Sequence, residues 1–350
     1  MSLAKLKVGL AQVAPVFLDA AATTAKACSV IDEAAKAGAD MVVFPETYIP
    51  AFPLWAAIRA PIYNHDYFVR LAQNSPKIDG PEMAQIAAAA RRSNIFVSMG
   101  FNEGTAASVG CIWNSNALYG RDGRLLNHRR KIVPTYYEKL VWAPGDAAGL
   151  EVVDTEIGRI GALICGENTN PLARYALIAQ GEQLHISTYP PAWPTRDPRD
   201  ATNYNLAEAI RIRAAAHSFE AKVFNVVVSG CLTDEIIEQV AGGDPSVHEL
   251  LQATPRGVSM VLDPAGNRIG GTDDNEETIA YVDIDLNACI EPKQFHDISG
   301  GYNRFDLFRL HVDRTPQPPA RFLNDAPPAS STEPVSVDRE ETPRPLPSFY

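Results

Sequence analysis

Hydrophobic and polar positions follow two different periodicities along most of the chain. Short apolar runs such as 7–13 and 41–44 indicate buried strands, whereas alanine-rich stretches with apolar residues at helical spacing, 20–37 and 81–93, indicate helices. Further strands are predicted at 95–100, 114–119, 159–164, 183–187, 224–229, 258–262 and 278–284, and further helices at 171–180 and 204–220. Turn residues at 121–124 and 263–267 predict two hairpins. Strands interleaved with helices indicate an α/β protein whose sheets are covered by helices.

The periodic pattern stops near residue 315. Nine of the chain's 27 prolines lie between 316 and 347, in a segment with little apolar material for a core. With 350 residues, 46% of them hydrophobic, the chain fits one large domain better than several small ones. We therefore expect one domain over 1–312 and an extended or disordered tail over 313–350.

Charge and cysteine content narrow the class of function. A net charge of −11 and a pI near 5.2 argue against nucleic acid or an anionic membrane as partner and favour small-molecule chemistry. No apolar stretch reaches membrane-spanning length, and residues 1–7 lead directly into a strand, which predicts a cytoplasmic protein. The five cysteines are scattered and lack zinc-type pairs. We expect mostly reduced thiols and neither a metal nor a cofactor.

Cys165 lies where the apolar run 159–164 ends and a helix-like segment begins near residue 170. A thiol on such a turn is held at the end of a sheet, near backbone amides and the positive end of a helix, which favour a thiolate. A lone cysteine after a strand is also often an inert core thiol. Gly166, which permits an unusual backbone conformation, and the polar residues 167–170 favour a nucleophile.

Glu46 also follows an apolar run directly. Residues 42–44 and Pro45 precede it, so its carboxylate is expected in a partly dry cleft, where a raised pKa suits a general base. A solvated loop glutamate is the alternative, and this segment alone does not separate the two.

The basic residues 128–131 run into an apolar and aromatic stretch that ends at Glu138. A basic cluster is usually a solvated surface, but Lys131 could point inward and stabilise the negative charge of a tetrahedral intermediate. Glu138 could orient that lysine or transfer a proton, or it could form a purely structural ion pair. Because no Cys/His pair is visible locally, the lysine and the carboxylates would have to activate Cys165.

Taken together, these segments resemble a known family, the carbon-nitrogen hydrolase superfamily, and within it the nitrilase branch. Its three signature regions are matched by Phe44-Pro45-Glu46, by Arg130-Lys131 with 134–138, and by Cys165-Gly166-Glu167 with 171–175. The stretches 136–146 and 180–186 are also nitrilase-like, so the resemblance covers most of residues 5–312.

The resemblance implies a four-layer α-β-β-α sandwich that hydrolyses a nitrile to a carboxylic acid and ammonia through a thioimidate and a thioester. By the same resemblance Glu46 would be the base, Lys131 the charge stabiliser, Cys165 the nucleophile and Glu138 a supporting fourth member. The chain departs from the family at Gly166, where nitrilases commonly carry tryptophan, and at residues 300–302, which read Gly-Gly-Tyr instead of Gly-His-Tyr. Both departures bear on the substrate pocket and on the partition between acid and amide.

An apolar and aromatic substrate pocket is expected beside the reactive segments. Its candidate residues are Tyr48, Trp55, Tyr136, Gly166, Tyr189 and Trp193. Ordinary core packing is the alternative for roughly half of them. His128, His185 and His217 have no metal-ligand spacing and are expected to be structural.

Two other functions stay open at this level. The same site could be an amidase or a hydratase that releases the amide, or the chain could be a non-catalytic scaffold with a vestigial site. The presence of all three family residues argues against the scaffold. The resemblance further implies a small-molecule nitrile as substrate, no nucleic-acid or membrane partner, and a homo-oligomer built from dimers. Which nitrile is used does not follow from the sequence.

Overall fold

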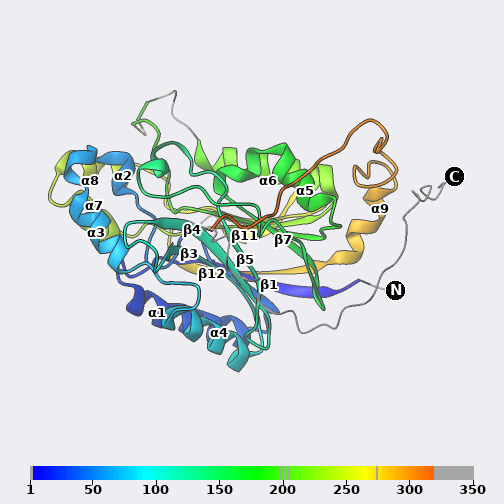
Figure 1. The fold of residues 1–350 in the computed structure, drawn as a ribbon, viewed down its shortest axis with the longest axis horizontal. Coiled ribbons are helices and arrows are strands. Elements are labelled where there is room, and N and C mark those ends of the chain that lie inside the picture. Colours follow the sequence, from blue (N-terminus) through cyan, green and yellow to red (C-terminus); the bar gives the residue numbers. More distant parts are fainter. Residues whose placement is uncertain (1–2, 198, 201, 203–204, 273–274, 319–350) are drawn as a thin grey trace, which may run out of the picture. The chain divides into compact units, whose positions relative to one another are not determined.

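Two six-stranded sheets face each other in the computed structural model, which describes residues 3–318 except 198, 201, 203–204 and 273–274 (Figure 1). Most of the tail predicted at 313–350 lies outside the described residues. Within the part of the chain that is described, no helix has both the length and the apolar character needed to cross a bilayer.

The first sheet has the strand order β12-β1-β2-β3-β4-β5. Its strands are β1 (Lys5–Gln12), β2 (Met41–Val43), β3 (Phe96–Gly104), β4 (Ile112–Tyr119), β5 (Leu125–Arg130) and β12 (Thr278–Asp285). The three strands β1, β2 and β3 are parallel, and β12, β4 and β5 extend the sheet with antiparallel pairs. The hairpin predicted at 121–124 joins β4 to β5.

The second sheet has the order β11-β10-β9-β8-β7-β6. Its strands are β6 (Val153–Thr155), β7 (Gly158–Ile164), β8 (Leu184–Tyr189), β9 (Phe224–Ser229), β10 (Ser259–Leu262) and β11 (Arg268–Thr272). Again three strands, β7, β8 and β9, are parallel, with one antiparallel strand on one side and two on the other. The two sheets therefore share one topology, although the sequence shows no repeat.

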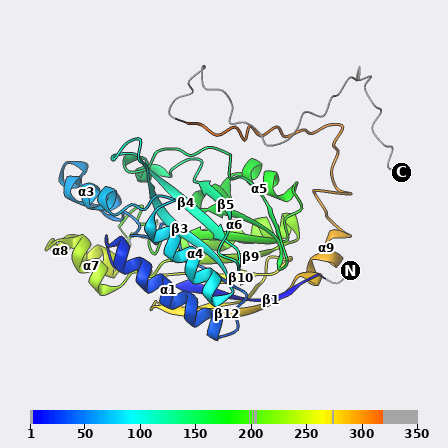
Figure 2. The ribbon, with the colours of Figure 1, turned by 60° about the horizontal axis from the view of Figure 1, so that its bottom comes forward.

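Helices cover the outer face of each sheet and complete the predicted four layers. Helices α1 (Ala20–Lys36) and α4 (Pro81–Ser93) pack on the first sheet, where Figure 2 shows them side by side. Helices α5 (Pro171–Ile178) and α6 (Leu206–Ala221) lie on the second sheet. Alternate strand residues such as Val8, Ile186 and Val226 fill the space between the sheets. Because both faces of the parallel strands are covered, most of their residues are buried, which agrees with the apolar runs in the sequence.

Two of the predicted helices begin where a polar side chain caps them. Asp19 accepts a hydrogen bond from the Ala22 N–H at the start of α1, and Asn170 accepts from Leu172 N–H before α5. Such caps satisfy amides that have no partner in the first turn. This explains why the predicted boundaries of these two helices agree with the observed ones within about two residues, the usual uncertainty of a helix end.

Short helices that the sequence pattern did not predict gather at one end of the sandwich. They are α2 (Trp55–Ile58), α3 (His65–Gln73), α7 (Asp234–Ala241) and α8 (Pro245–Gln252). Their apolar residues form one cluster with Phe52, Tyr137 and Trp142. The remaining elements are the 3-10 helices η1 (Pro61–Tyr63), η2 (Tyr136–Leu140), η3 (Cys165–Thr169) and η4 (Leu286–Cys289), and the helix α9 (Ile290–Lys293). All the helices named in this paragraph are too short to show a helical period in the sequence.

Candidate active site

Three strand ends deliver the three predicted reactive residues to one place. Glu46 follows β2, Lys131 follows β5 and Cys165 follows β7. An oxygen of Glu46, an oxygen of Glu138 and Sγ of Cys165 all lie within 4.8 Å of one another, and all three residues are buried. The carboxyl ends of parallel strands are the usual place for a site in an α/β protein.

Each of the three loops contains one non-glycine residue with a left-handed backbone. Thr47 has φ 45°, Tyr136 has φ 49° and Cys165 itself has φ 52°. Such residues cost roughly 1–3 kcal/mol and persist only where the surroundings hold them, which is common at active sites. The unusual conformation expected at Gly166 thus lies at Cys165 instead, because Gly166 is not among the residues with positive φ in the described chain.

Lys131 points inward and bridges two carboxylates. Its side chain is fully buried, and Nζ lies 2.8 Å from Oε1 of Glu46 and 2.6 Å from Oε2 of Glu138. Burial alone would lower the pKa of Lys131, but the negative charges of Glu46 and Glu138 outweigh it and raise this pKa above its usual range. Lys131 is therefore a buried ammonium ion.

Glu138 is held by the start of η2. The backbone N–H of Thr135 donates to Glu138 Oε2 at 2.7 Å, while the Thr135 side chain accepts from the Glu138 N–H in a capping box. Two donors on Oε2 leave Oε1 buried and without a hydrogen-bond partner among the described residues.

Glu46 has the properties of a base that works near neutral pH. Burial raises the pKa of its carboxyl to about 7, against the opposing effects of Lys131 and of the Asn114 hydrogen bond. Its Oε1 accepts from Lys131 and, at 2.6 Å, from Nδ2 of Asn114. Its Oε2 is buried with no hydrogen-bond partner in the described part of the chain and is thus available to exchange a proton.

The thiol of Cys165 is protonated at rest. Burial raises its pKa well above the usual range, Glu46 raises it further, and Lys131 lowers it only in part. This corrects the expectation that backbone amides and a helix end would favour a resting thiolate. The 3-10 helix η3 lies between Cys165 and α5, and the poor solvation of a buried thiolate has the largest effect on the pKa of Cys165. The thiol must therefore lose its proton to a neighbouring base when it reacts.

Arg129 and Glu167, the residue two positions after Cys165, form a further buried ion pair that the sequence did not reveal. Arg129 binds both carboxylate oxygens of Glu167, at 2.7 and 2.9 Å. Glu167 also accepts from the backbone N–H of Ile164 at 2.8 Å and of Ile132 at 2.6 Å. One carboxylate thus ties the loop that carries Lys131 to the turn that carries Cys165.

Gly166 lies against Thr135, the residue that caps η2. A Cβ atom at position 166 would stand 2.7 Å from Oγ1 of Thr135, which is closer than real Cβ contacts. A tryptophan, which nitrilases commonly carry here, would not fit this arrangement. The departure at Gly166 is therefore coupled to the position of Thr135.

A small apolar cavity of about 20 Å³ adjoins Glu46. Tyr48 lines this cavity, and its hydroxyl donates to the Ala14 carbonyl at 3.3 Å. Trp55 is buried in the cluster of short helices, where its ring stacks on Tyr67 with 5.7 Å between centroids, and it does not line the cavity. Of these two predicted substrate residues, the geometry brings only Tyr48 next to the candidate base.

Tyr136 and its neighbour Tyr137 point in different directions. Tyr136 is 70% exposed, whereas Tyr137 is buried and its ring lies 5.4 Å from the ring of Trp193. Burial raises the pKa of Tyr137, and the carboxylates of Glu138 and Glu46 raise it further, so its hydroxyl lies close to the charged groups of the site. Tyr189, at the end of β8, packs in the same apolar cluster as Cys165. Tyr137 is the aromatic residue that the sequence argument missed, because adjacent tyrosines in an irregular segment carry no periodic signal.

Among the residues that the structure describes, two buried groups have the composition of metal ligands. They are Glu46–Glu138–Cys165 and Glu182–His185–His217. The Lys131 ammonium ion already occupies the cation position of the first group. In the second, the nitrogen–oxygen distances are 2.6 and 2.7 Å, which are hydrogen-bond lengths, whereas two ligands of a tetrahedral zinc ion lie roughly 3.3 Å apart. Both groups as they stand fit protons and not a metal ion.

The chain matches known proteins over most of its length. A carbon-nitrogen hydrolase family model matches residues 7–294. A nitrilase of Paraburkholderia phymatum is 33% identical over 90% of this chain and 88% of its own length. An arylacetonitrilase of Hypocrea virens is 35% identical over 90% of this chain and 94% of its own length. A cyanide hydratase of Gibberella zeae is 35% identical over 89% of this chain and 88% of its own length.

The fold also has a counterpart among solved structures. A carbon-nitrogen hydrolase from Helicobacter pylori G27 aligns with a TM-score of 0.66 at 19% identity, over 83% of this chain and 93% of that one. At this identity the likeness supports the four-layer fold alone, while the family model and the curated relatives supply the match in sequence. The chain therefore belongs to the carbon-nitrogen hydrolase family.

Proposed function

We propose that this protein is a nitrilase that hydrolyses a small-molecule nitrile to a carboxylic acid and ammonia, with Cys165 as nucleophile. The observation that carries the proposal is the buried group of a protonated thiol, a carboxyl with a pKa of about 7 and a lysine ammonium ion between two carboxylates. Relatives at 33–35% identity are named nitrilase and arylacetonitrilase, which supports nitriles as the substrate class.

The first half of the reaction attaches the substrate. Glu46 accepts the thiol proton of Cys165, and the sulfur adds to the nitrile carbon while the nitrogen takes the proton back from Glu46. One S–C bond forms, one π bond of the nitrile is lost, and the product is a thioimidate. The free Oε2 of Glu46 suits this transfer because Oε1 is already held by Lys131 and Asn114.

The second half consumes two water molecules. Glu46 takes a proton from the first water, whose oxygen adds to the thioimidate carbon, and the Lys131 ammonium ion stabilises the charge of the tetrahedral intermediate. Glu46 passes this proton to the nitrogen and then transfers the proton of the added hydroxyl to it as the C–N bond breaks, so ammonia leaves and the carbonyl of a thioester remains. A second water cleaves the C–S bond, which releases the carboxylic acid and restores the thiol.

Release of the amide is the second candidate activity. If the C–S bond of the tetrahedral intermediate breaks before the C–N bond, one water is consumed and the amide leaves. Two observations support the amide as a candidate product. The chain resembles a cyanide hydratase, and Gly166 changes the surroundings of Cys165.

A substrate panel tests both candidates. The purified protein is incubated with aliphatic, aromatic and arylaceto-nitriles, with cyanide and with the matching amides, and acid, amide and ammonia are quantified separately. We expect acid and ammonia in equal amounts from at least one nitrile and no turnover by Cys165→Ala. Ammonia released from amides but never from nitriles would replace the nitrilase by an amidase, and full activity of Cys165→Ala would remove the nucleophile from the proposal.

We further propose that the protein self-associates and works in the cytoplasm, as its resemblance and its sequence led us to expect. Sedimentation velocity over a range of concentrations tests the first point, and cell fractionation tests the second. A species that sediments as a 38.0 kDa monomer at every concentration would contradict self-association.

A further inference from the structure

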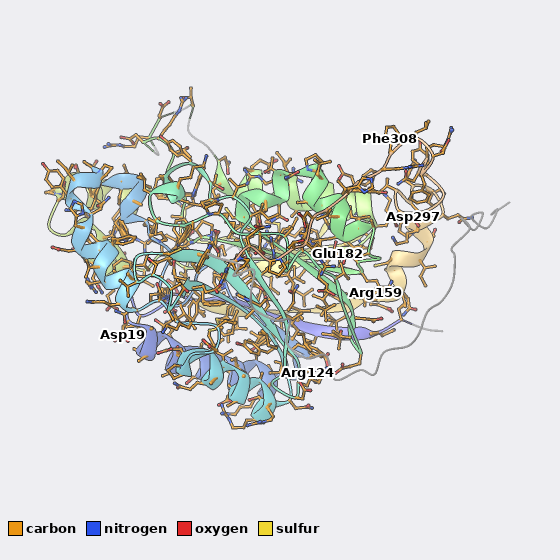
Figure 3. The ribbon with its side chains drawn as sticks, in the orientation of Figure 1. Asp19, Arg124, Arg159, Glu182, Asp297 and Phe308 are labelled. Atoms are coloured by element: carbon orange, nitrogen blue, oxygen red, sulfur yellow. The ribbon has the colours of Figure 1, made fainter. Side chains whose placement is uncertain are left out.

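A buried cluster of charged groups is connected to Cys165 through Asn168 and takes no direct part in the proposed reaction. Glu182 precedes β8, His185 lies on β8 and His217 on α6, and all three side chains are fully buried. Figure 3 places the labelled Glu182 in the interior, in contrast to Asp19 and Arg124 at the periphery. The rings of His185 and His217 stack with 3.8 Å between their centroids.

The hydrogen bonds of this cluster assign its protons. Nδ1 of His185 lies 2.6 Å from Oε1 of Glu182, and Nε2 of His185 lies 2.9 Å from Oδ1 of Asn168. The identity of that Asn168 oxygen is certain, because Nδ2 of the same amide donates to the carbonyls of Leu163 and Cys165 at 3.2 and 3.1 Å. Burial would raise the pKa of Glu182, but His185 and His217 hold it at about 2, so Glu182 is a carboxylate. Both nitrogens of His185 therefore face acceptors that carry no hydrogen.

His217 is the neutral residue of this cluster. Its Nε2 lies 2.7 Å from Oε2 of Glu182, and its Nδ1 has no hydrogen-bond partner among the described residues. Burial and the charge of His185 lower the pKa of His217 to about 4. Arg174 of α5, which acts on His217 in the same direction, is itself paired with Glu220 of α6 at 2.9 Å. Two stacked cations would repel each other, so one charged and one neutral ring is the arrangement expected at neutral pH.

The cluster reaches Cys165 through a single side chain. The Asn168 amide accepts from His185 on one side and donates to the Cys165 carbonyl on the other. It thereby holds the left-handed backbone of the nucleophile, whose φ is 52°. Ser187 lies 3.0 Å from the same Asn168 oxygen, and its hydroxyl is an uncharged partner.

We infer that His185 is a doubly protonated, buried imidazolium and that its ion pair with Glu182 positions the Cys165 nucleophile by fixing the amide of Asn168. His185 is in this sense a positioning residue, since it touches neither substrate nor the reacting atoms. The effect of His185 on turnover rests on the proposed function. Its charge and its effect on the position of Cys165 do not depend on that function.

Charge and positioning are tested separately. Nitrogen-15 NMR of histidine-labelled, unaltered protein should detect one ring with protons on both nitrogens at neutral pH, because burial and two hydrogen bonds slow the exchange of both N–H protons with water. A single nitrogen proton on every histidine ring at that pH would overturn the charge assignment. This measurement requires no substrate and no variant.

Positioning is tested with His185→Gln, which keeps one N–H donor and removes the charge, and with Ser187→Ala as the matched neutral change at the same Asn168 oxygen. The readouts are kcat, KM and the rate of Cys165 alkylation by iodoacetamide, followed by mass spectrometry without any nitrile. We expect His185→Gln to lower kcat and alkylation about 10- to 100-fold while KM changes little, and Ser187→Ala to cause a smaller loss. Asn168→Asp, which turns the donor to Cys165 into an acceptor, gives the same test should His185→Gln not fold.

The outcomes separate this inference from the proposed function. A folded His185→Gln protein with unaltered alkylation and kcat would overturn the positioning role, as would a larger loss in Ser187→Ala. If no nitrile is turned over while alkylation of His185→Gln is slow, the proposed function fails and the positioning role stands.

Discussion

At the scale of single residues, the chemistry depends on how burial and neighbouring charges set the protonation of three groups. Lys131 keeps its proton because two carboxylates surround it, whereas Cys165 keeps its proton because its anion would be poorly solvated. Glu46 lies between these extremes with a pKa of about 7. It is the group that can both accept and return a proton near neutral pH, which is what a general base must do in each half of the reaction.

The hydrogen bond from Asn114 to Glu46 should tune the acid side of the pH profile. This bond lowers the pKa of Glu46, so Asn114→Ala should raise that pKa further. Because the base acts in its deprotonated form, the acid limb of kcat/KM, expected near pH 7, should move to higher pH. The measurement is a pH profile of kcat/KM on the best nitrile.

Asn116→Ala is the matched control for this shift. Asn116 lies two residues along the same strand and donates to Ser98 at 3.1 Å, away from Glu46. The acid limb of kcat/KM for Asn116→Ala should lie at the same pH as that of the unaltered protein. An acid limb that stays in place in Asn114→Ala, or moves to lower pH, would show that Glu46 does not govern it.

At the scale of elements, two short 3-10 helices share one contact. Thr135 caps η2 and so places Glu138, while Gly166 at the start of η3 leaves room for the Thr135 hydroxyl. Gly166 thus acts on the loop that carries Lys131 and Glu138 through its contact with Thr135.

Gly166→Ala should therefore be destabilising in a way that Thr135→Ala relieves. The added methyl group should displace the Thr135 hydroxyl, break the cap of η2, lower kcat and reduce the free energy of unfolding by about 1–3 kcal/mol. Thr135→Ala alone should cost about 1 kcal/mol. Urea unfolding of both single variants and the double variant should give less than the sum of the two losses.

Gly301→Ala provides the control for this cycle. A Cβ at position 301 meets no atom within 4 Å, so the unfolding free energy should not change beyond roughly 0.5 kcal/mol. Strict additivity of Gly166→Ala and Thr135→Ala would contradict the proposed contact.

At the scale of the whole molecule, the site exists only because the two sheets are held in one alignment. Glu46 and Lys131 come from the first sheet and Cys165 from the second. Apolar residues such as Val8 and Ile186 fill the interlayer. Apolar packing of this kind fixes the spacing but not the exact direction of the loops, whereas the buried Arg129–Glu167 pair joins a strand end of one sheet to the turn after a strand of the other.

Removing one partner of that pair should weaken the whole fold. Arg129→Met leaves the Glu167 carboxylate buried without its cation, so the free energy of unfolding should fall by about 3–5 kcal/mol. Arg211→Met on α6 is the matched control, because it breaks an exposed pair with Glu208 and should cost no more than about 0.5 kcal/mol. Equal midpoints of urea unfolding for the two variants would contradict a structural role of the Arg129–Glu167 pair.

The sequence alone was sufficient for features that depend on local order. Apolar runs and helical spacing predicted the parallel strands and the helices α1, α4, α5 and α6, because strands buried on both faces and capped helices leave a direct pattern in the chain. Two of these runs end directly before Glu46 and Cys165, so the sequence also placed these two residues at strand ends, whereas Lys131 follows the basic residues 128–130. Their catalytic roles stay predictions.

Only the tertiary structure decided the contacts between residues far apart in the chain. Arg129 and Glu167 are 38 positions apart in the chain, and His217 and Glu182 are 35 positions apart. No local sequence pattern predicts either pair. Proton positions depend on burial and on such partners, which is why Cys165 is a thiol at rest and His185 a cation in our inference. Residue order determines which groups reach a strand end, and packing determines which charges they meet there.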